Sequence, residues 1–356
     1  MKLTIVRSEL ARVLTNVGRV VESKNTIPIL GNVKLSAVPG QLRITGTDLD
    51  IVAADVAPAD VEQDGDICVD AKLLADIAKK AGGDIAISLE GDRLIVKSGR
   101  SVFKLATLAA ADFPDLKDGK YDASFDVDLA ALFAPTAFAI STEETRYYLN
   151  GIFLHLHEDG DQYLRAVATD GHRLSRHQVA YPGEDAFKGV IVPRKTVGLV
   201  PKGKVTVSVG DSKIQITAGD FVITSKLIDG TFPDYERVIP RANESRVIVD
   251  RDAFMKAADR VATVSSERGR AVKLSIAPGS IGFTVSNADA AATDEIEAEY
   301  SGEPIDIGFN AAYLRDLFSV LQSGPVTIAL ADGGSPGLFT SAGFEGLTLV
   351  AMPMRV

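Results

Sequence analysis

The hydrophobic positions of the chain follow two periods, one typical of helices and one typical of strands. Leu10, Val13, Leu14 and Val17 recur at helical spacing, whereas apolar and polar residues alternate over 85–89. A period of about 3.6 residues predicts an amphipathic helix, and a period of two predicts a strand with one buried face. Because the two patterns follow one another repeatedly, they predict an α+β fold with helices over antiparallel sheets.

Six segments carry the helical pattern: 8–21, 71–81, 128–138, 193–204, 251–261 and 311–322. The fourth has room only for a short helix, because Gly198 and Pro201 interrupt it. Alternating runs at 85–96 and 205–216 each turn at a Gly-Asp pair, which predicts antiparallel hairpins. Two helices and a set of hairpins therefore form each repeated unit.

Two short sequences recur along the chain. The first lies at 42–48, 164–170 and, in a weaker form, 281–287. The second is Phe-Pro-Asp in its first two copies, and its copies lie at 113–115, 232–234 and 352–354. The period of roughly 120 residues is the length of an ordinary domain. We therefore predict three repeated domains at 1–120, 121–242 and 243–356.

The charge of the chain is unevenly distributed. The formal net charge of −10 argues against an entirely basic nucleic-acid-binding protein. The six helical segments, however, contain thirteen lysines and arginines against six acidic residues, a net +7, so the remainder carries −17. This split predicts one positive helical surface facing a polyanion. Since aromatic residues are not interleaved with the basic ones, we expect contacts to phosphates and no reading of bases.

One stretch, 168–174, suggests catalysis, since it contains Asp170 and His172 and is followed by Ser175. A catalytic triad needs side chains that converge from a fixed scaffold, whereas these three lie within six residues at a predicted bend. The Thr-Asp pair recurs at 47–48, and an Asp in a turn accepts backbone N–H groups two residues further on. We therefore predict a structural turn and no enzymatic activity, with a hydrolase using these residues as the alternative.

Few residues are suited to metals or disulfides. The single cysteine, Cys68, excludes an internal disulfide and a four-cysteine zinc site. His155 and His157 lie on one strand face without two further ligands nearby, so we expect neither metal nor cofactor. The N-terminus has no apolar signal core, and no apolar run of about 18 residues occurs. We therefore expect a cytoplasmic protein.

Eight stretches, in order along the whole chain, resemble the bacterial sliding clamp family, the beta subunit of DNA polymerase III. They are TIPILGN (26–32), GTDL (46–49), SGRS (98–101), RYYLNG (146–151), ATDGHRL (168–174), VPRK (192–195), FPDY (232–235) and MPMR (352–355). The resemblance implies a head-to-tail homodimer in which each chain forms half of a six-domain ring. Helices would line the inside, around double-stranded DNA, and the ring would tether the replicative polymerase for processivity.

The resemblance also implies sites on the ring. The DNA-binding residues implied are Lys24, Arg146 and Tyr148, and the charge pattern adds Arg194 and Lys195. The dimer interface implied uses Leu73, Leu74, Ile77, Phe103 and Leu105 on one side and Thr263 and Val264 on the other. A scaffold that binds peptides without encircling DNA is the alternative reading of the chain.

The partners implied are the polymerase III alpha subunit, the clamp loader, other polymerases and repair proteins. Each would dock a short motif with Gln, then Leu and Phe, in a pocket between the second and third domains. Methionine and leucine form an adaptable apolar cup, and Arg and His at its rim can bind peptide carbonyls. The wall implied consists of Leu149, Thr169, Gly171, His172, Arg173, Leu174, Pro233, Arg237, Val238, Val350, Met352, Pro353, Met354 and Arg355.

Overall fold

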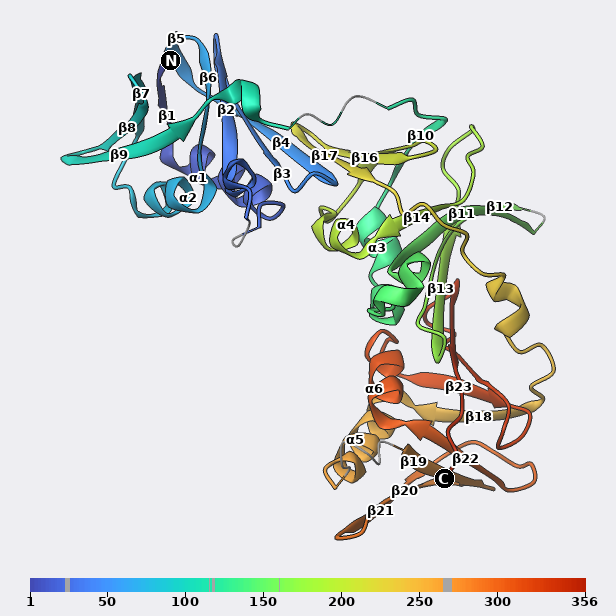
Figure 1. The fold of residues 1–356 in the computed structure, drawn as a ribbon. Helices are drawn as coiled ribbons and strands as arrows, with labels where there is room; N and C mark the ends of the chain where they lie inside the picture. The colour runs from blue at the N-terminus through green and yellow to red at the C-terminus, as the bar shows by residue number, and fades with distance from the viewer. Residues whose placement is uncertain (23–25, 115, 117–118, 160, 265–270) are drawn as a thin grey trace. The chain divides into compact units, whose positions relative to one another are not determined.

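A computed structural model of the chain describes residues 1–22, 26–114, 116, 119–159, 161–264 and 271–356 (Figure 1). The chain divides into two compact units. The first contains Met1–Leu129, Pro182–Phe187 and Gly198–Leu227, and the second contains Ala130–Tyr181, Lys188–Val197 and Ile228–Val356. In the part described, no helix is long and apolar enough to cross a lipid bilayer.

The first unit is built on one antiparallel sheet of 13 strands, in the order β10-β15-β16-β17-β4-β3-β2-β6-β9-β8-β7-β1-β5. The strands are β1 (Lys2–Ile5), β2 (Asn32–Val38), β3 (Gln41–Thr47), β4 (Ile51–Pro58), β5 (Asp60–Gln63), β6 (Gly65–Asp70), β7 (Ile85–Glu90), β8 (Arg93–Ser98), β9 (Ser101–Leu108), β10 (Ala123–Val127), β15 (Val205–Val209), β16 (Lys213–Ala218) and β17 (Phe221–Lys226). The predicted hairpins are confirmed: β7 pairs with β8, and β15 pairs with β16.

Two helices of the first unit, α1 (Arg7–Gly18) and α2 (Ala71–Lys80), pack against each other, and α1 also contacts β3 and β4. The apolar face that the sequence predicts for α1 is buried in the core of this unit. The helix ends at Gly18 and not at Val21. The Asp70 carboxylate caps α2 by accepting the Leu73 N–H at 2.6 Å, which satisfies a donor at the start of the helix.

The second unit contains an eight-stranded sheet, β14-β11-β12-β13-β25-β24-β23-β18, and a four-stranded sheet, β21-β20-β19-β22. The strands are β11 (Gly151–Asp159), β12 (Asp161–Thr169), β13 (Arg173–Ala180), β14 (Val190–Pro193), β18 (Ser245–Asp250), β19 (Ala271–Ala277), β20 (Ser280–Ser286), β21 (Ala291–Glu297), β22 (Ile305–Asn310), β23 (Pro325–Leu330), β24 (Gly337–Thr340) and β25 (Leu347–Ala351). All the pairings in both sheets are antiparallel, as the alternating pattern predicts.

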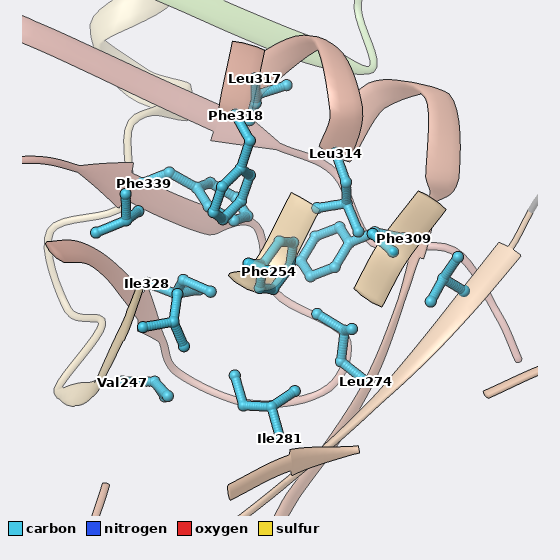
Figure 2. Packing of buried hydrophobic residues seen from close by; sticks show 14 of the residues in the cluster. Val247, Phe254, Leu274, Ile281, Phe309, Leu314, Leu317, Phe318, Ile328 and Phe339 are labelled. Carbon is cyan, nitrogen blue, oxygen red and sulfur yellow. The ribbon is translucent and has the colours of Figure 1, made fainter. Parts of the chain in front are cut away.

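The helices α5 (Arg251–Ala262) and α6 (Ala311–Ser319) pack against each other over a core rich in phenylalanine. Figure 2 shows Phe254 of α5 beside Phe318 of α6, and their ring centroids are 4.0 Å apart at an interplanar angle of 4°. Phe309, Phe339 and Leu314 complete the packing around them. Burial of such large side chains is the main favourable contribution to folding here.

The two remaining α-helices are short. α3 spans Leu129–Phe133 and α4 spans Arg194–Leu199. The sequence predicts more of α3, but the helix ends two residues before Pro135, since proline disfavours helical backbone in the residue before it. Short 3-10 helices follow elsewhere at η1 (Pro28–Gly31), η2 (Ala110–Asp112), η3 (Ala137–Ala139), η4 (Glu144–Leu149) and η5 (Tyr235–Val238).

Both large sheets join strands from neighbouring sequence repeats. In the first unit β4 pairs with β17, with Ile51 opposite Ser225. In the second unit β13 pairs with β25, with Arg173 opposite Ala351. The middle third of the sequence therefore contributes strands to both units: β10 and β15 to β17 extend the sheet of the first repeat, and β11 to β14 extend that of the third.

Candidate binding pocket at a sheet junction

The site is built around a tight turn between β12 and β13. The Thr169 hydroxyl donates to the Arg173 carbonyl oxygen at 2.7 Å and accepts the Gly171 N–H at 3.1 Å. The Asp170 carboxylate accepts the N–H groups of His172 and Arg173 at 2.9 and 3.0 Å. These side chains therefore bind backbone groups that would lack a strand partner where the chain reverses.

The same turn occurs at the two other copies of the repeated sequence. In the first, Asp48 accepts the N–H groups two and three residues further on, at 3.0 and 2.7 Å. In the third, the Asn287 side chain accepts the corresponding two groups at 2.8 Å each. The prediction that Asp170 is a turn residue is confirmed, because its carboxylate binds the same backbone groups as its two counterparts.

Ser175 does not converge with Asp170 and His172. Its side chain is fully buried, and its hydroxyl donates to the carbonyl oxygen of Pro135 at 2.7 Å. His172 is exposed, and its ring stacks on that of Tyr313 with the centroids 6.1 Å apart. These three residues therefore lack the chain of hydrogen bonds that a nucleophile, a base and an acid need.

An apolar cavity of about 160 Å³ opens beside the turn. It is lined by Leu149, Thr169, Gly171, His172, Arg173, Leu174, Pro233, Asp234, Tyr235, Val238, Val350 and Met352. Ten of these are among the fourteen residues that the resemblance implies, and they come from four separate stretches of the chain. Asp234 and Tyr235 were missed, although they lie in the FPDY motif that pointed to Pro233.

The cavity is the open end of a small apolar core. Residues 228–239, the linker segment, cover one face of the eight-stranded sheet, and Phe232 stacks on Phe153 with ring centroids 4.9 Å apart. The buried members of this core are Leu149, Val167, Leu174, Ile191, Phe232, Tyr235 and Val350. Leu174 and Val350 are opposite each other in the β13–β25 ladder and form the floor of the cavity. The junction of the two strands is therefore what creates the pocket.

Arg173 is held by two carboxylates and a carbonyl. Its guanidinium donates to Asp170 at 3.0 Å, to Asp316 at 2.6 Å and to the Phe138 carbonyl at 3.0 Å. It also lies 5.1 and 4.6 Å from the ring centroids of Phe138 and Tyr313. Charge-assisted hydrogen bonds and cation–π contacts are strong on a side chain that is only 12% exposed. Arg173 therefore links β13 to α6.

Four of the implied wall residues lie outside the cavity: Arg237, Pro353, Met354 and Arg355. The Met354 N–H donates to the Gly308 carbonyl at 2.8 Å, which places the tail beside β22. Arg237 forms an exposed ion pair with Asp234 at 2.8 Å and lines a neighbouring hollow. The role of these four residues in peptide binding stays a prediction.

The implied DNA-binding residues are placed as follows. Lys24 lies outside the described residues. Arg146 donates two hydrogen bonds of 2.7 Å to Glu143, which hold the pKa of its guanidinium above the ordinary value. Tyr148 packs partly against the small core beneath the linker segment. Arg194 is exposed and Lys195 half-buried at the start of α4. Their contact with DNA stays a prediction.

The implied dimer-interface residues of the first unit differ in exposure, and their role stays a prediction. Leu74, Ile77 and Leu105 are 0%, 5% and 6% exposed in the single chain and belong to the core of the first unit. Leu74 and Ile77 both face inward because they are three residues apart on one face of α2. Leu73 on the other face of α2 is 48% exposed, and Phe103 is 37% exposed.

The remaining implied interface residues lie in the second unit. Thr263 is exposed, whereas Val264 packs partly against the phenylalanine-rich core.

Among the residues described, no group of three or more His, Cys, Asp or Glu side chains is arranged to hold a metal ion. Cys68 is fully buried, and its burial raises the thiol pKa to about 11. The cavity is lined by apolar, hydrogen-bonding and charged side chains.

Comparison with known proteins covers the whole chain. Sequence profiles of the DNA polymerase III beta subunit match at 1–117 (N-terminal domain), 126–234 (central domain) and 236–355 (C-terminal domain). The chain is 45% identical to the beta sliding clamp of Caulobacter vibrioides and 36% identical to that of Escherichia coli, with 100% of both chains covered in each comparison.

Solved structures agree with the sequence relatives. A sliding clamp from Bartonella birtlesii bound to griselimycin is 42% identical with a TM-score of 0.96. The polymerase III beta subunit of Caulobacter crescentus is 43% identical with a TM-score of 0.95, and both comparisons cover 100% of each chain. Since every repeat, strand junction and motif lies within these matches, the chain belongs to the DNA polymerase III beta subunit family, the beta sliding clamps.

Proposed function

We propose that the chain is a DNA sliding clamp, a processivity factor without enzymatic activity that tethers the polymerase of the DNA polymerase III holoenzyme to duplex DNA in the cytoplasm. The family match along the whole chain is the observation that carries this proposal. The domains are 1–120, 121–242 and 243–356. The buried Ser175 hydroxyl, bound to Pro135, supports a role without catalysis.

Unpaired strand edges support a head-to-tail homodimer. The strand after the first repeated turn, β4, pairs with the last strand of the next repeat, β17, and β13 likewise pairs with β25. The strand after the third turn, β21, pairs within the described residues only with β20. β9 ends the first repeat, and over 101–106 its described pairing is with β8 alone. A second copy can therefore place its β9 beside β21, as the two internal junctions do.

Charge supports this seam. β21 carries Glu295 and Glu297, whereas β9 carries Lys104. Opposite charges on facing edges favour this pairing over pairing of like edges. A seam that copies the register of the two internal junctions would have Thr293 of one copy opposite Val102 of the other.

A pair of cysteines tests the seam. In Val102→Cys with Thr293→Cys, Cα atoms about 5 Å apart allow a disulfide across the interface, and oxidation is expected to yield a covalent dimer. Mixing the two single variants gives dimers linked at one seam. A double variant that stays monomeric on a denaturing gel after oxidation, while the native mass is that of a dimer, contradicts this register.

Basic side chains on the helices support contact with DNA phosphates. Arg12 and Arg260 are bound to Asp55 and Asp294, so exposed lysines such as Lys79 contribute more to DNA binding than these arginines. The residues proposed to contact DNA are Lys24, Arg146, Tyr148, Arg194 and Lys195, together with Lys79 and Lys80. These contacts would be to the backbone, which lets the ring slide.

Retention on circular and on cut DNA tests whether the protein encircles the duplex. The protein is loaded on a nicked circular plasmid, and half of the sample is then cut at one site. A sliding clamp stays on the circle through gel filtration and leaves the linear form. Equal retention on both forms contradicts encirclement. Charge reversal of Lys79, Lys80, Arg194 and Lys195 is expected to weaken DNA retention, whereas a peptide-binding scaffold without DNA encirclement would be unaffected.

The pocket is proposed to bind the clamp-binding motif of partner proteins: the polymerase III alpha subunit, the clamp loader, other polymerases and repair proteins. An apolar floor of Leu174 and Val350 suits the Leu and Phe of such a motif. The exposed His172 beside the cavity can bind the Gln or the peptide carbonyls. The fourteen wall residues implied by the resemblance stay part of this proposal, with Asp234 and Tyr235 added.

A further inference from the structure

One wall of the pocket is not part of any sheet. Pro233, Asp234, Tyr235 and Val238 belong to the linker segment, whereas the turn and the floor belong to strands. The position of this wall relative to the floor therefore depends on what holds the linker segment against the sheet. Phe232 provides an apolar anchor by stacking on Phe153, but stacking of two rings permits sliding and does not define one position.

A buried polar network provides the second anchor. The Tyr235 hydroxyl lies 3.0 Å from His155 Nε2 and accepts a hydrogen bond from the Arg165 guanidinium at 3.2 Å. The same guanidinium donates to the Glu236 carboxylate at 2.5 Å and, through Nε, to the Gln178 side chain at 2.7 Å. Hydrogen bonds require defined directions, so this network determines where η5 lies on β11, β12 and β13.

The charges of the network are unequal. Arg165 is 4% exposed, and Arg176 beside it is 18% exposed. Both are close to the single carboxylate of Glu236, at 2.5 and 3.8 Å. Burial alone would raise the pKa of Glu236, but the two guanidinium charges outweigh burial and lower it. Glu236 is thus ionised at neutral pH, and without it two largely buried cations would face each other.

The network does not line the cavity. Of its members only Tyr235 does so, and Arg165, Arg176, Gln178 and Glu236 are absent from the lining. Glu236 lines only the neighbouring hollow, with Asp234 and Arg237, so a change at Glu236 alters no contact inside the apolar cavity itself. It alters the position and the rigidity of the wall formed by Pro233 and Val238.

We propose that Arg165 and Glu236 are positioning residues of the docking pocket: they do not line its apolar cavity, but they fix the linker segment at the distance from the β13–β25 junction that a bound peptide requires. This inference rests on the proposed function of the pocket. A wall that is already in place costs a peptide less on binding than a wall that must be ordered. Affinity should therefore depend on a salt bridge outside the site.

The test uses Glu236→Gln in the full-length dimer, with a synthetic peptide containing Gln followed by Leu and Phe as the probe. Fluorescence anisotropy is expected to give a dissociation constant about five- to tenfold higher than that of the wild type. The matched control is Glu62→Gln, which removes the surface ion pair with Lys2 in the first unit and should leave affinity unchanged.

A purely structural role would lower the melting temperature and leave the affinity of the folded protein unchanged, and that outcome overturns the inference. Tyr235→Phe serves as a second variant if Glu236→Gln does not fold, because it removes one hydroxyl and keeps the ring. Weaker binding with faster amide hydrogen exchange over 233–238 supports the inference. A wild-type protein that does not bind the peptide overturns the proposed pocket itself, which distinguishes the two failures.

Discussion

The turns at 47–51 and 169–173 have the same hydrogen bonds and different surroundings. In each, a threonine hydroxyl donates to the carbonyl four residues further on, at 2.9 and 2.7 Å. In each, the third residue has a left-handed backbone, with φ of 81° at Leu49 and 89° at Gly171. Only the second turn borders the cavity. The backbone motif is therefore a scaffold, and the difference in function comes from the side chains placed on it.

Two positions account for that difference. Gly171 has no Cβ, and a Cβ there would lie 2.6 Å from the Arg146 guanidinium, which packs against this position. Arg173 reaches Asp316 of α6, whereas Ile51 at the corresponding place is buried in the first unit. Variants that carry the residues of the first turn at these two positions test how far stability and peptide affinity depend on them.

The largest effect is expected from Arg173→Ile, which copies the first turn into the second. The change leaves Asp316 and the Phe138 carbonyl without their guanidinium, at a cost of about 3 kcal/mol in the free energy of unfolding. Peptide affinity should fall at least about tenfold, because the rim loses its ordered cation. Denaturant unfolding and fluorescence anisotropy measure the two effects.

The matched control is Lys226→Ala. It removes the exposed ion pair of Lys226 with Asp50 at the first turn, at 3.0 Å, and should cost no more than about 0.5 kcal/mol. Equal losses from the two variants would contradict the view that only the second turn is tied to a neighbouring helix.

A smaller effect is expected from exchanging the left-handed residues. Gly171→Leu should cost about 1–2 kcal/mol, since left-handed backbone is unfavourable for a residue with a Cβ and Arg146 must move away. Leu49→Gly relieves the same strain but makes the unfolded chain freer, so it should be neutral or stabilise by about 1 kcal/mol. Urea unfolding measures both. A loss of stability in Leu49→Gly would mean that the Leu49 side chain makes contacts that outweigh its strain.

The smallest effect concerns pH and also distinguishes the two units. All four histidines lie in the second unit, and burial lowers the pKa of both His155 and His177 below 6.5. The unfolded chain therefore binds protons first as the pH falls through about 6.5, and stability decreases from there. The carboxylate of Glu236 contributes no change in this range, because its pKa is lowered and its effect begins only below about 4.5.

Thermal unfolding at pH 7.5 and 5.5 tests this expectation. The loss on acidification should be up to about 1.4 kcal/mol for each unit by which a histidine pKa is lowered. His177→Gln should reduce the loss of stability on acidification, because Gln does not titrate. The variant should keep its fold, since Gln can still donate to the Leu132 carbonyl that His177 Nδ1 approaches at 3.0 Å. An unchanged pH dependence in this variant would show that His177 is not responsible.

Much of the fold could be predicted from local patterns. The apolar faces of α1, α2, α5 and α6 follow helical spacing, and the Gly-Asp turns identify the hairpins, because both signals lie within a few residues. The helical segment expected over 128–138 is interrupted by Pro135, and α3 ends two residues before it. Burial was harder to assign: Leu73 and Leu74 are adjacent and equally apolar, yet only the helix orientation decides which one is exposed.

The sequence by itself determined the threefold repeat and the three turns, because duplicated motifs can be recognised without coordinates. Most of the residues around the pocket came from the resemblance of the sequence to the sliding clamp family. The tertiary structure alone decided that β13 lies beside β25, that Arg173 meets Asp316, and that Arg165 holds Tyr235 and Glu236 beneath the linker segment. These contacts join residues up to 178 positions apart in the ladder of Arg173 and Ala351. Periodicity reports only on near neighbours, so packing had to establish them.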